Sequence, residues 1–223
     1  MMYRALTALM RHLASIVLGD LLIVEGRENV PRHRALLVVS NHVATLDPPL
    51  TGAFIPRLDV HYLAKSEHFT RGSTRWLFYG YHAFPVLRGT ADRQALNHAR
   101  DLLRRGHAVV IYPEGARSWD GRLRRPHPGA GFLARHTGAV ILPVAVWGTE
   151  HVITRERLWP RRAAVHVCFG PPFFLPATER AGRLSNQRAA DEMMRHVAEL
   201  LPLRYRGIFN GETDIEAVPP AAA

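Results

Sequence analysis

The feature that most constrains this chain is a series of short apolar runs that end in turn residues and alternate with helical patterns. The clearest runs cover residues 35–39, 60–64 and 108–112, and the strongest helical pattern covers 91–105. Short unbroken apolar runs that stop at turn residues are typical of buried strands. Buried strands that alternate with helices predict an α/β fold, with a largely parallel central sheet and helices on both of its faces.

Weaker patterns extend the same alternation over the rest of the chain. Further strands are predicted at 21–25, 83–86, 140–146 and 164–169, and further helices at 48–55, 74–79, 129–137 and 187–200. Pro143 lies inside one of these strands and predicts an edge position or a bulge, because proline has no N–H to donate. A length of 223 residues favours one domain, which we place at 19–210, and the Pro/Ala-rich tail at 211–223 is predicted to be disordered.

The first 18 residues have a helical period of their own. The apolar stripe consists of Leu6, Leu9, Met10, Leu13, Ile16 and Val17. Arg4 and Arg11 fall outside this stripe, so residues 1–18 predict a short amphipathic helix. Two interpretations stay open: the helix packs on the domain, or it lies on an acidic membrane surface. The sequence contains no run of about 20 apolar residues, so no membrane-spanning helix is predicted.

Composition narrows the range of partners. The formal net charge of +10 favours an anionic partner, such as a phosphate ligand, an acidic lipid surface or nucleic acid. We find no nucleic-acid recognition motif and expect no nucleic-acid partner. Cys168 is the only cysteine, which excludes an internal disulfide and a thiolate metal cluster. The histidines show no metal-ligand spacing, so no metal site is predicted.

The strongest candidate for chemistry is the pair His42 and Asp47, which follows the buried run 35–39. Because Pro48 suits the first position of a helix, Asp47 is predicted to cap a helix that begins there. A strand–turn–helix can fold His42 back onto the Asp47 carboxylate. A carboxylate bound to one ring nitrogen fixes the tautomer and leaves the other nitrogen available as a base.

Charged side chains also follow other predicted strands. Lys65, Arg88 and Arg117 each come after such a strand, and Glu114 lies close to the last of them. The carboxyl ends of parallel strands meet at one edge of a sheet, so we expect these residues to gather near His42. A base with several cations suits a substrate that bears a phosphate and a hydroxyl to be deprotonated.

At these residues the sequence resembles the glycerolipid acyltransferases, specifically the 1-acylglycerol-3-phosphate acyltransferases. Residues 41–47 (NHVATLD) are similar to the family's His-x-x-x-x-Asp motif, and residues 83–88, 112–118 and 141–145 resemble its three later blocks. Lys65 also fits the family pattern. Two positions depart from it: Ala116 replaces a common threonine, and Leu87 replaces a common acid.

The resemblance implies an acyltransferase fold, an activity and roles for the site residues. His42, oriented by Asp47, would deprotonate the hydroxyl of a lysophosphatidic acid, and the oxygen would attack an acyl thioester of coenzyme A or acyl carrier protein. Lys65, Arg88 and Arg117 would bind the acceptor phosphate, while Glu114 and Gly115 would position the substrate. Backbone N–H groups of the His42 turn are candidate donors to the oxyanion.

The same resemblance sets the remaining expectations. The product would be phosphatidic acid, no cofactor is expected, and the protein would be peripheral at the cytoplasmic face of the plasma membrane. Alternatives remain open from the sequence. They are acyl transfer to another lysophospholipid or a glycolipid, hydrolysis of the thioester by water, and a basic membrane- or nucleic-acid-binding protein without catalysis.

Overall fold

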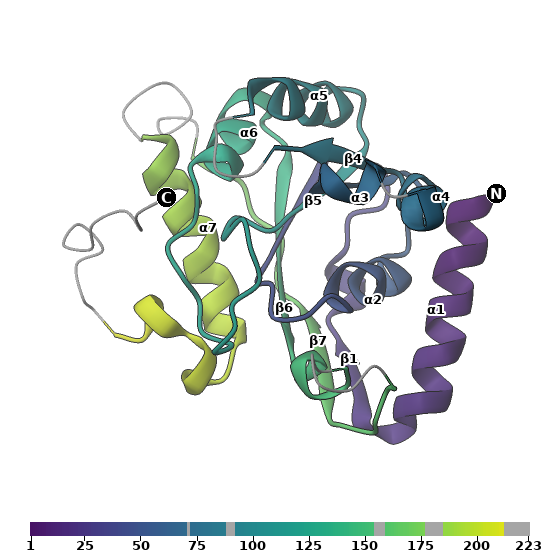
Figure 1. The fold of residues 1–223 in the computed structure, drawn as a ribbon. Coiled ribbons are helices and arrows are strands. Elements are labelled where there is room, and N and C mark those ends of the chain that lie inside the picture. The colour runs from purple at the N-terminus through teal and green to yellow at the C-terminus, as the bar shows by residue number, and fades with distance from the viewer. Residues whose placement is uncertain (71, 88–91, 154–158, 177–184, 212–223) are drawn as a thin grey trace.

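The computed structural model describes residues 1–223 except 71, 88–91, 154–158, 177–184 and 212–223. Within the described residues, seven strands form one sheet in the order β1-β7-β6-β2-β5-β3-β4 (Figure 1). The strands are β1 (Leu22–Glu25), β2 (Leu36–Ser40), β3 (Val60–Lys65), β4 (Ala83–Val86), β5 (Ala108–Ile111), β6 (Val140–Trp147) and β7 (Val165–Phe169). All neighbours pair in parallel except β6 and β7, so the predicted largely parallel sheet is confirmed.

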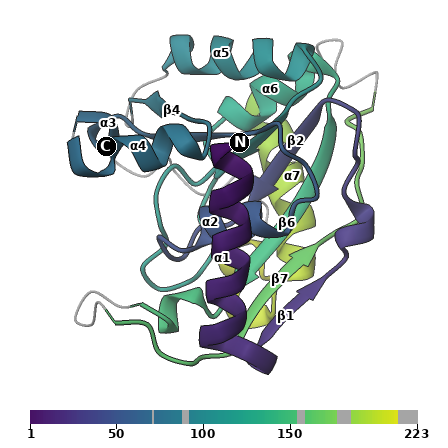
Figure 2. The same cartoon turned by 90° about the vertical axis from the view of Figure 1, so that its right-hand side faces the viewer.

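Helices cover both faces of this sheet, as predicted. They are α1 (Met2–Leu18), α2 (Asp47–Phe54), α3 (Glu67–Thr70), α4 (Gly72–Gly80), α5 (Arg93–Arg104), α6 (Gly129–Thr137) and α7 (Asn186–Leu200). Figures 1 and 2 show α1 and α2 on one face and α6 and α7 on the other. On β2, Leu36 and Val38 belong to the core under α1 and α2, whereas Leu37 and Val39 belong to the core under α5 to α7. Because successive strand residues point to opposite faces, a strand covered on both faces needs an unbroken apolar run.

Strand β6 lies inside the sheet, between β7 and β2, so the edge position predicted from Pro143 is wrong. Pro143 is level with Val39 of β2, and the ladder with β7 begins one residue later, at Val144. The Pro143 carbonyl accepts a hydrogen bond from the Gly170 N–H at 2.9 Å. The proline therefore stands just outside the β6–β7 ladder, where its missing N–H interrupts no paired position.

Helix α1 has two apolar faces. Tyr3, Ala14 and Leu18 are buried in the core, and the Tyr3 hydroxyl lies 3.2 Å from that of Tyr62 on β3. Half of the predicted apolar stripe points to solvent: Leu9, Leu13 and Ile16 are 54%, 45% and 66% exposed. The helix therefore packs on the domain and still presents apolar side chains outward.

Helix α4 lies beside the N-terminal half of α1 (Figure 2). A Cβ added at Gly80 would meet Leu6 Cδ1 at 2.7 Å, so glycine permits this close approach. Trp76 and Tyr79 of α4 are also exposed. Among the described residues, no helix combines the length and the apolar character that crossing a bilayer requires.

The connections place the turn after β2 at a special position. The crossover through α2 leads from β2 to β3, whereas the later crossover through α6 leads from β5 to β6, on the other side of β2. The chain thus changes direction across the sheet at β2. In open α/β sheets, ligands bind beyond the carboxyl ends of the strands at such a switch point.

Candidate active site

His42 and Asp47 meet directly in the turn after β2. His42 Nδ1 lies 2.8 Å from Asp47 Oδ2, and the same oxygen accepts hydrogen bonds from the N–H groups of Val43 and Ala44 at 2.7 Å each. The second oxygen, Oδ1, accepts a hydrogen bond from the Thr149 hydroxyl at 2.5 Å. Asp47 is completely buried, so these four donors replace the water that its carboxylate would otherwise bind.

This geometry corrects the predicted role of Asp47 as a helix cap. Asp47 is the first residue of α2, Leu46 is the cap position, and no side chain caps the helix. The carboxylate turns back to the preceding loop and the end of β6 instead. It closes the His42 turn, because three donors from three consecutive residues converge on one oxygen.

Asn41 joins the start of this turn to β6. Its side-chain amide donates to the Val146 carbonyl at 2.7 Å and accepts from the Val146 N–H at 2.8 Å. The side chain thus continues the β2–β6 ladder one residue beyond the last backbone pair, Ser40 with Val144. Neither Asn41 nor Thr149 was assigned a role from the sequence.

Glu114 lies against the backbone of the turn. Its Oε1 accepts from the His42 N–H and its Oε2 from the Arg124 N–H, each at 3.1 Å. Ser118 N–H donates to the His42 carbonyl at 2.8 Å, so the segment after β5 holds both peptide groups of His42. Burial raises the pKa of Glu114 to about 7, against the lowering effect of these two hydrogen bonds. Glu114 thus binds protein backbone, and its predicted role in positioning the substrate stays a prediction.

These contacts also remove the expected oxyanion donors. The N–H of His42 is bound to Glu114, and those of Val43 and Ala44 are bound to Asp47. A donor already committed to a buried carboxylate is not available to a developing oxyanion. These three N–H groups of the His42 turn are therefore ruled out as the candidate oxyanion donors in this structure.

The ring of Tyr112, at the end of β5, packs against the imidazole. The two ring centroids are 4.5 Å apart with an interplanar angle of 33°. With Nδ1 facing Asp47 on one edge and Tyr112 beside the ring, His42 has one orientation. Its side chain keeps 10% exposure. In the neutral tautomer in which the Nδ1–H group donates a hydrogen bond to the carboxylate, Nε2 carries a free lone pair, and no described residue donates a hydrogen bond to it.

Gly115 follows Glu114 with φ of +71°, a conformation that side chains rarely adopt. A Cβ there would also lie 2.8 Å from Cδ2 of the His127 ring. Glycine at this position is therefore explained by the turn itself. Its predicted role in positioning a substrate stays a prediction.

The structure places two of the three predicted phosphate-binding cations. Arg117 Nη1 donates to the hydroxyl of Thr45, inside the loop that joins His42 to Asp47, at 2.7 Å. Lys65 ends β3, and its Nζ lies 2.7 Å from Glu67, whose pKa it lowers to about 2 through this hydrogen bond. Arg88 lies outside the described residues. Arg117 thus contacts the loop that joins the two dyad residues, whereas Lys65 already has an anionic partner.

Sequence signals for the missed residues existed. Thr149 follows β6, and the rule that site residues follow parallel strands could have been applied there as well. Asn41 adjoins His42 in the chain. In the part of the chain that the structure describes, no three His, Cys, Asp or Glu side chains are grouped so that they could hold a metal ion.

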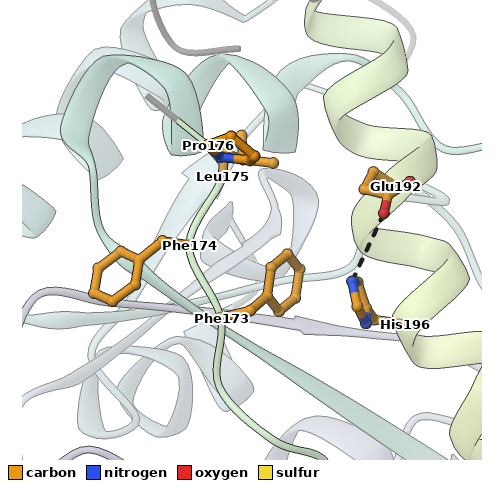
Figure 3. Close-up of a pocket in the computed structure, with 6 residues that line it drawn as sticks. All are labelled: Phe173, Phe174, Leu175, Pro176, Glu192 and His196. Carbon is orange, nitrogen blue, oxygen red and sulfur yellow. Dashed lines mark ion pairs between the residues drawn. The ribbon is translucent and has the colours of Figure 1, made fainter. Parts of the chain in front are cut away.

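A separate hollow lies away from the dyad. It has a volume of about 300 Å³ and is lined by Phe173, Phe174, Leu175 and Pro176 together with Glu192 and His196 of α7 (Figure 3). Phe173 packs on His196 with ring centroids 4.0 Å apart, while Phe174 points away (Figure 3). None of the predicted site residues lines it, and the adjoining segment 177–184 lies outside the described residues. We assign no ligand to it.

A buried carboxylate–imidazole pair at the switch point of a mostly parallel sheet, with an arginine beside it, defines a class of site in which histidine can take a proton from a bound substrate. A family model described as Acyltransferase matches residues 22–147, more than half of the chain. The chain belongs to this acyltransferase family.

Individual relatives are similar over most of the domain. The chain is 31% identical to the 1-acyl-sn-glycerol-3-phosphate acyltransferase of Bacillus subtilis, over 74% of this chain and 84% of that protein. It is also 31% identical to the lyso-ornithine lipid O-acyltransferase of Pseudomonas aeruginosa, over 50% of this chain and 42% of that protein. Two other curated relatives are longer, and the chain spans 37% and 62% of their length.

A solved structure shares the fold. It is the 1-acyl-sn-glycerophosphate (LPA) acyltransferase PlsC from Thermotoga maritima. The TM-score is 0.71 at 25% sequence identity, and the match covers 89% of this chain and 79% of that chain.

Proposed function

We propose that this protein transfers a fatty acyl group from an acyl thioester to the free hydroxyl of 1-acylglycerol-3-phosphate, giving phosphatidic acid. The observation that carries the proposal is the His42–Asp47 pair, held at 2.8 Å with Nε2 left as the acceptor, in a chain of the acyltransferase family. The similarity to the Bacillus subtilis 1-acyl-sn-glycerol-3-phosphate acyltransferase supports this acceptor.

The proposed reaction needs one proton shuttle. His42 Nε2 takes the proton from the acceptor hydroxyl while the hydroxyl oxygen bonds to the carbonyl carbon of the thioester. The carbon–sulfur bond then breaks, and the imidazolium returns the proton to the departing thiolate. Asp47 stabilises the imidazolium during this exchange, because its carboxylate faces Nδ1. The thioester is carried by coenzyme A or acyl carrier protein, and no cofactor is part of the proposal.

Arg117 is the proposed contact for the acceptor phosphate. It is bound to Thr45 of the dyad loop, and no carboxylate pairs with it among the described residues. Lys65 and Arg88 are proposed to assist, and Lys65 would first exchange its contact with Glu67 for the phosphate. A guanidinium suits a phosphate because its N–H groups can bind two oxygens at once.

A second acceptor has its own support. The similarity to a lyso-ornithine lipid O-acyltransferase favours a lysolipid with an amino-acid headgroup in place of the phosphate. The same dyad would serve either acceptor, since an O-acyl transfer removes a proton from a hydroxyl in both cases. The alternatives of thioester hydrolysis and of binding without catalysis have no separate observation in their favour.

We propose that the enzyme works as a peripheral protein on an acidic membrane, at the cytoplasmic face of the plasma membrane. The exposed Leu9, Leu13 and Ile16 on α1, and Trp76 and Tyr79 on α4, support a membrane contact. These two helices contain no acidic residue. Anionic lipids attract basic segments at a membrane surface.

The test is thiol release from an acyl thioester, with and without acceptor, with mass spectrometry of the lipid product. We expect release that depends on lysophosphatidic acid and a phosphatidic acid product. Release without any acceptor would indicate hydrolysis, and release only with an amino-acid lysolipid would favour the second acceptor. No release with either donor or acceptor would contradict the proposed function.

A further inference from the structure

Arg117 is held by two side chains that no family motif assigned to the site. Its Nη1 donates to the Thr45 hydroxyl at 2.7 Å, and its guanidinium carbon lies 4.8 Å from the centroid of the Trp119 ring. Thr45 is exposed in the loop between His42 and Asp47. Trp119, two residues after Arg117, is 62% exposed.

This pair of contacts fixes the guanidinium without neutralising it. An indole face attracts a cation through its quadrupole, and a threonine oxygen accepts one N–H, but neither carries a charge. Among the described residues, Arg117 has no carboxylate partner, in contrast to Lys65 with Glu67. The guanidinium is thus positioned with its full charge available to an incoming anion.

The geometry also leaves N–H groups available. Thr45 occupies one donor, at Nη1, and among the described residues no other group accepts a hydrogen bond from the guanidinium. The remaining donors lie in the plane of the guanidinium, where a phosphate can bind two of them. A carboxylate partner would occupy these same N–H groups, so that they could not bind a phosphate.

The segment that carries Trp119 is itself anchored. Ser118 Oγ donates to the Arg122 carbonyl at 2.6 Å, and Arg124 Nη2 donates to the carbonyls of Ala116 and Arg117 at 3.0 and 2.9 Å. Ser118 N–H binds the His42 carbonyl. The support for Arg117 is therefore continuous with the backbone that positions the imidazole.

We infer that Thr45 and Trp119 are positioning residues that hold Arg117 ready for the acceptor's anionic headgroup, and that they set the preference for a phosphate-bearing acceptor. The inference rests on the proposed function, because it concerns how that acceptor is bound. It predicts effects on acceptor affinity and headgroup preference, with the donor KM unchanged.

The test uses a water-soluble short-chain lysophosphatidic acid, which removes membrane binding from the measurement. Trp119→Ala and Thr45→Val should each raise the acceptor KM about two- to fivefold, the range expected for one cation–π contact or one exposed hydrogen bond. The donor KM and the melting temperature should stay unchanged. Trp119→Phe and Thr45→Ser should restore most of the affinity, and Trp159→Ala, which removes a tryptophan that is 80% exposed elsewhere, should have no effect.

A double-mutant cycle separates this inference from the proposed function. In an Arg117→Ala background, Trp119→Ala and Thr45→Val should add nothing, because the group they position is gone. If Arg117→Ala raises the acceptor KM but the other two variants do not, or if their effects add independently, the inference is wrong and the proposed function stands. If Arg117→Ala itself leaves the acceptor KM normal, Arg117 does not bind the acceptor phosphate, and the inference about Thr45 and Trp119 is wrong with it. An acceptor without a phosphate should be insensitive to all three substitutions.

Discussion

The hydroxyl of Thr149 donates a hydrogen bond to Oδ1 of Asp47 across 102 residues of chain. This bond ties the segment after β6 to the first turn of α2, and it satisfies the one carboxylate oxygen that the His42 turn leaves unbound. Asp47 therefore has its orientation determined from both sides. Because His42 is hydrogen-bonded to this carboxylate, the orientation of Asp47 also fixes the orientation of the imidazole.

Thr149→Val should weaken both the fold and the reaction. The change leaves a completely buried carboxylate oxygen without a donor, and an unsatisfied group of this kind costs about 1–3 kcal/mol. We expect a lower melting temperature and a lower kcat, with little change in KM. Thr149→Ser keeps the hydroxyl and is the matched control. Equal stability and equal kcat in the two variants would show that the hydroxyl is dispensable.

His42→Ala should abolish turnover and leave the fold intact. Asp47 keeps three of its four donors in this variant, so the carboxylate does not become an unpaired buried charge. A positioned general base contributes about 10²–10⁴-fold to the rate. The measurement is kcat together with thermal unfolding, and His136→Ala, at an exposed position of α6, serves as the control. Folded His42→Ala protein with normal kcat would end the proposed mechanism.

Glu114 should make the stability of the protein depend on pH. Its folded pKa is raised to about 7 from 4.5, so between these values the folded state holds a proton that the unfolded state has released. Stability contributed by this group is complete below about pH 4.5 and is lost as the pH rises through about 7. The loss is roughly 3 kcal/mol.

Glu114→Gln isolates this contribution, because groups common to both proteins cancel in the difference. We expect the melting-temperature advantage of the wild-type protein over Glu114→Gln to be larger at pH 5 than at pH 8. The measurement is thermal unfolding of both proteins across that range. Parallel curves would mean that Glu114 does not change its protonation there.

Membrane contact should depend on the outward face of α1. Ile16→Ser removes an aliphatic side chain that is 66% exposed, and Leu203→Ser removes one that is 65% exposed after α7. We expect Ile16→Ser to weaken binding to vesicles that contain anionic lipid about fivefold, since partial burial of such a side chain is worth about 1 kcal/mol. Leu203→Ser should bind as the wild type does. Equal flotation of both variants would argue against α1 as the contact.

The sequence predicted the regular elements well where local pattern decides the outcome. Residues 129–137 form α6 with the predicted bounds, because an apolar face is followed by Gly138 in the left-handed conformation that ends the helix. The apolar run at 35–39 became β2, shifted by one residue, because only a strand buried on both faces needs such a run.

The failures have a common physical cause, which is contact between distant segments. Pro143 has the local properties of an edge residue, and only the register against β7 shows that its missing N–H is harmless. Asp47 has the local properties of a cap, but donors from the preceding loop and from Thr149 outweigh that use. The dyad itself could be predicted because its partners are five residues apart.

The pairing of β1 with β7 imposes an order on biosynthesis. Leu22 lies beside Val165, so β1 leaves the ribosome about 140 residues before its hydrogen-bonding neighbour exists. At about 5–20 residues per second, the nascent chain waits roughly 7–28 s with that edge unpaired. Helix α1 emerges earlier still, with both of its apolar faces uncovered. If α1 contacts a bilayer as proposed, that contact is available before the sheet is complete, and a chain that stops before β7 would leave β1 without its neighbour.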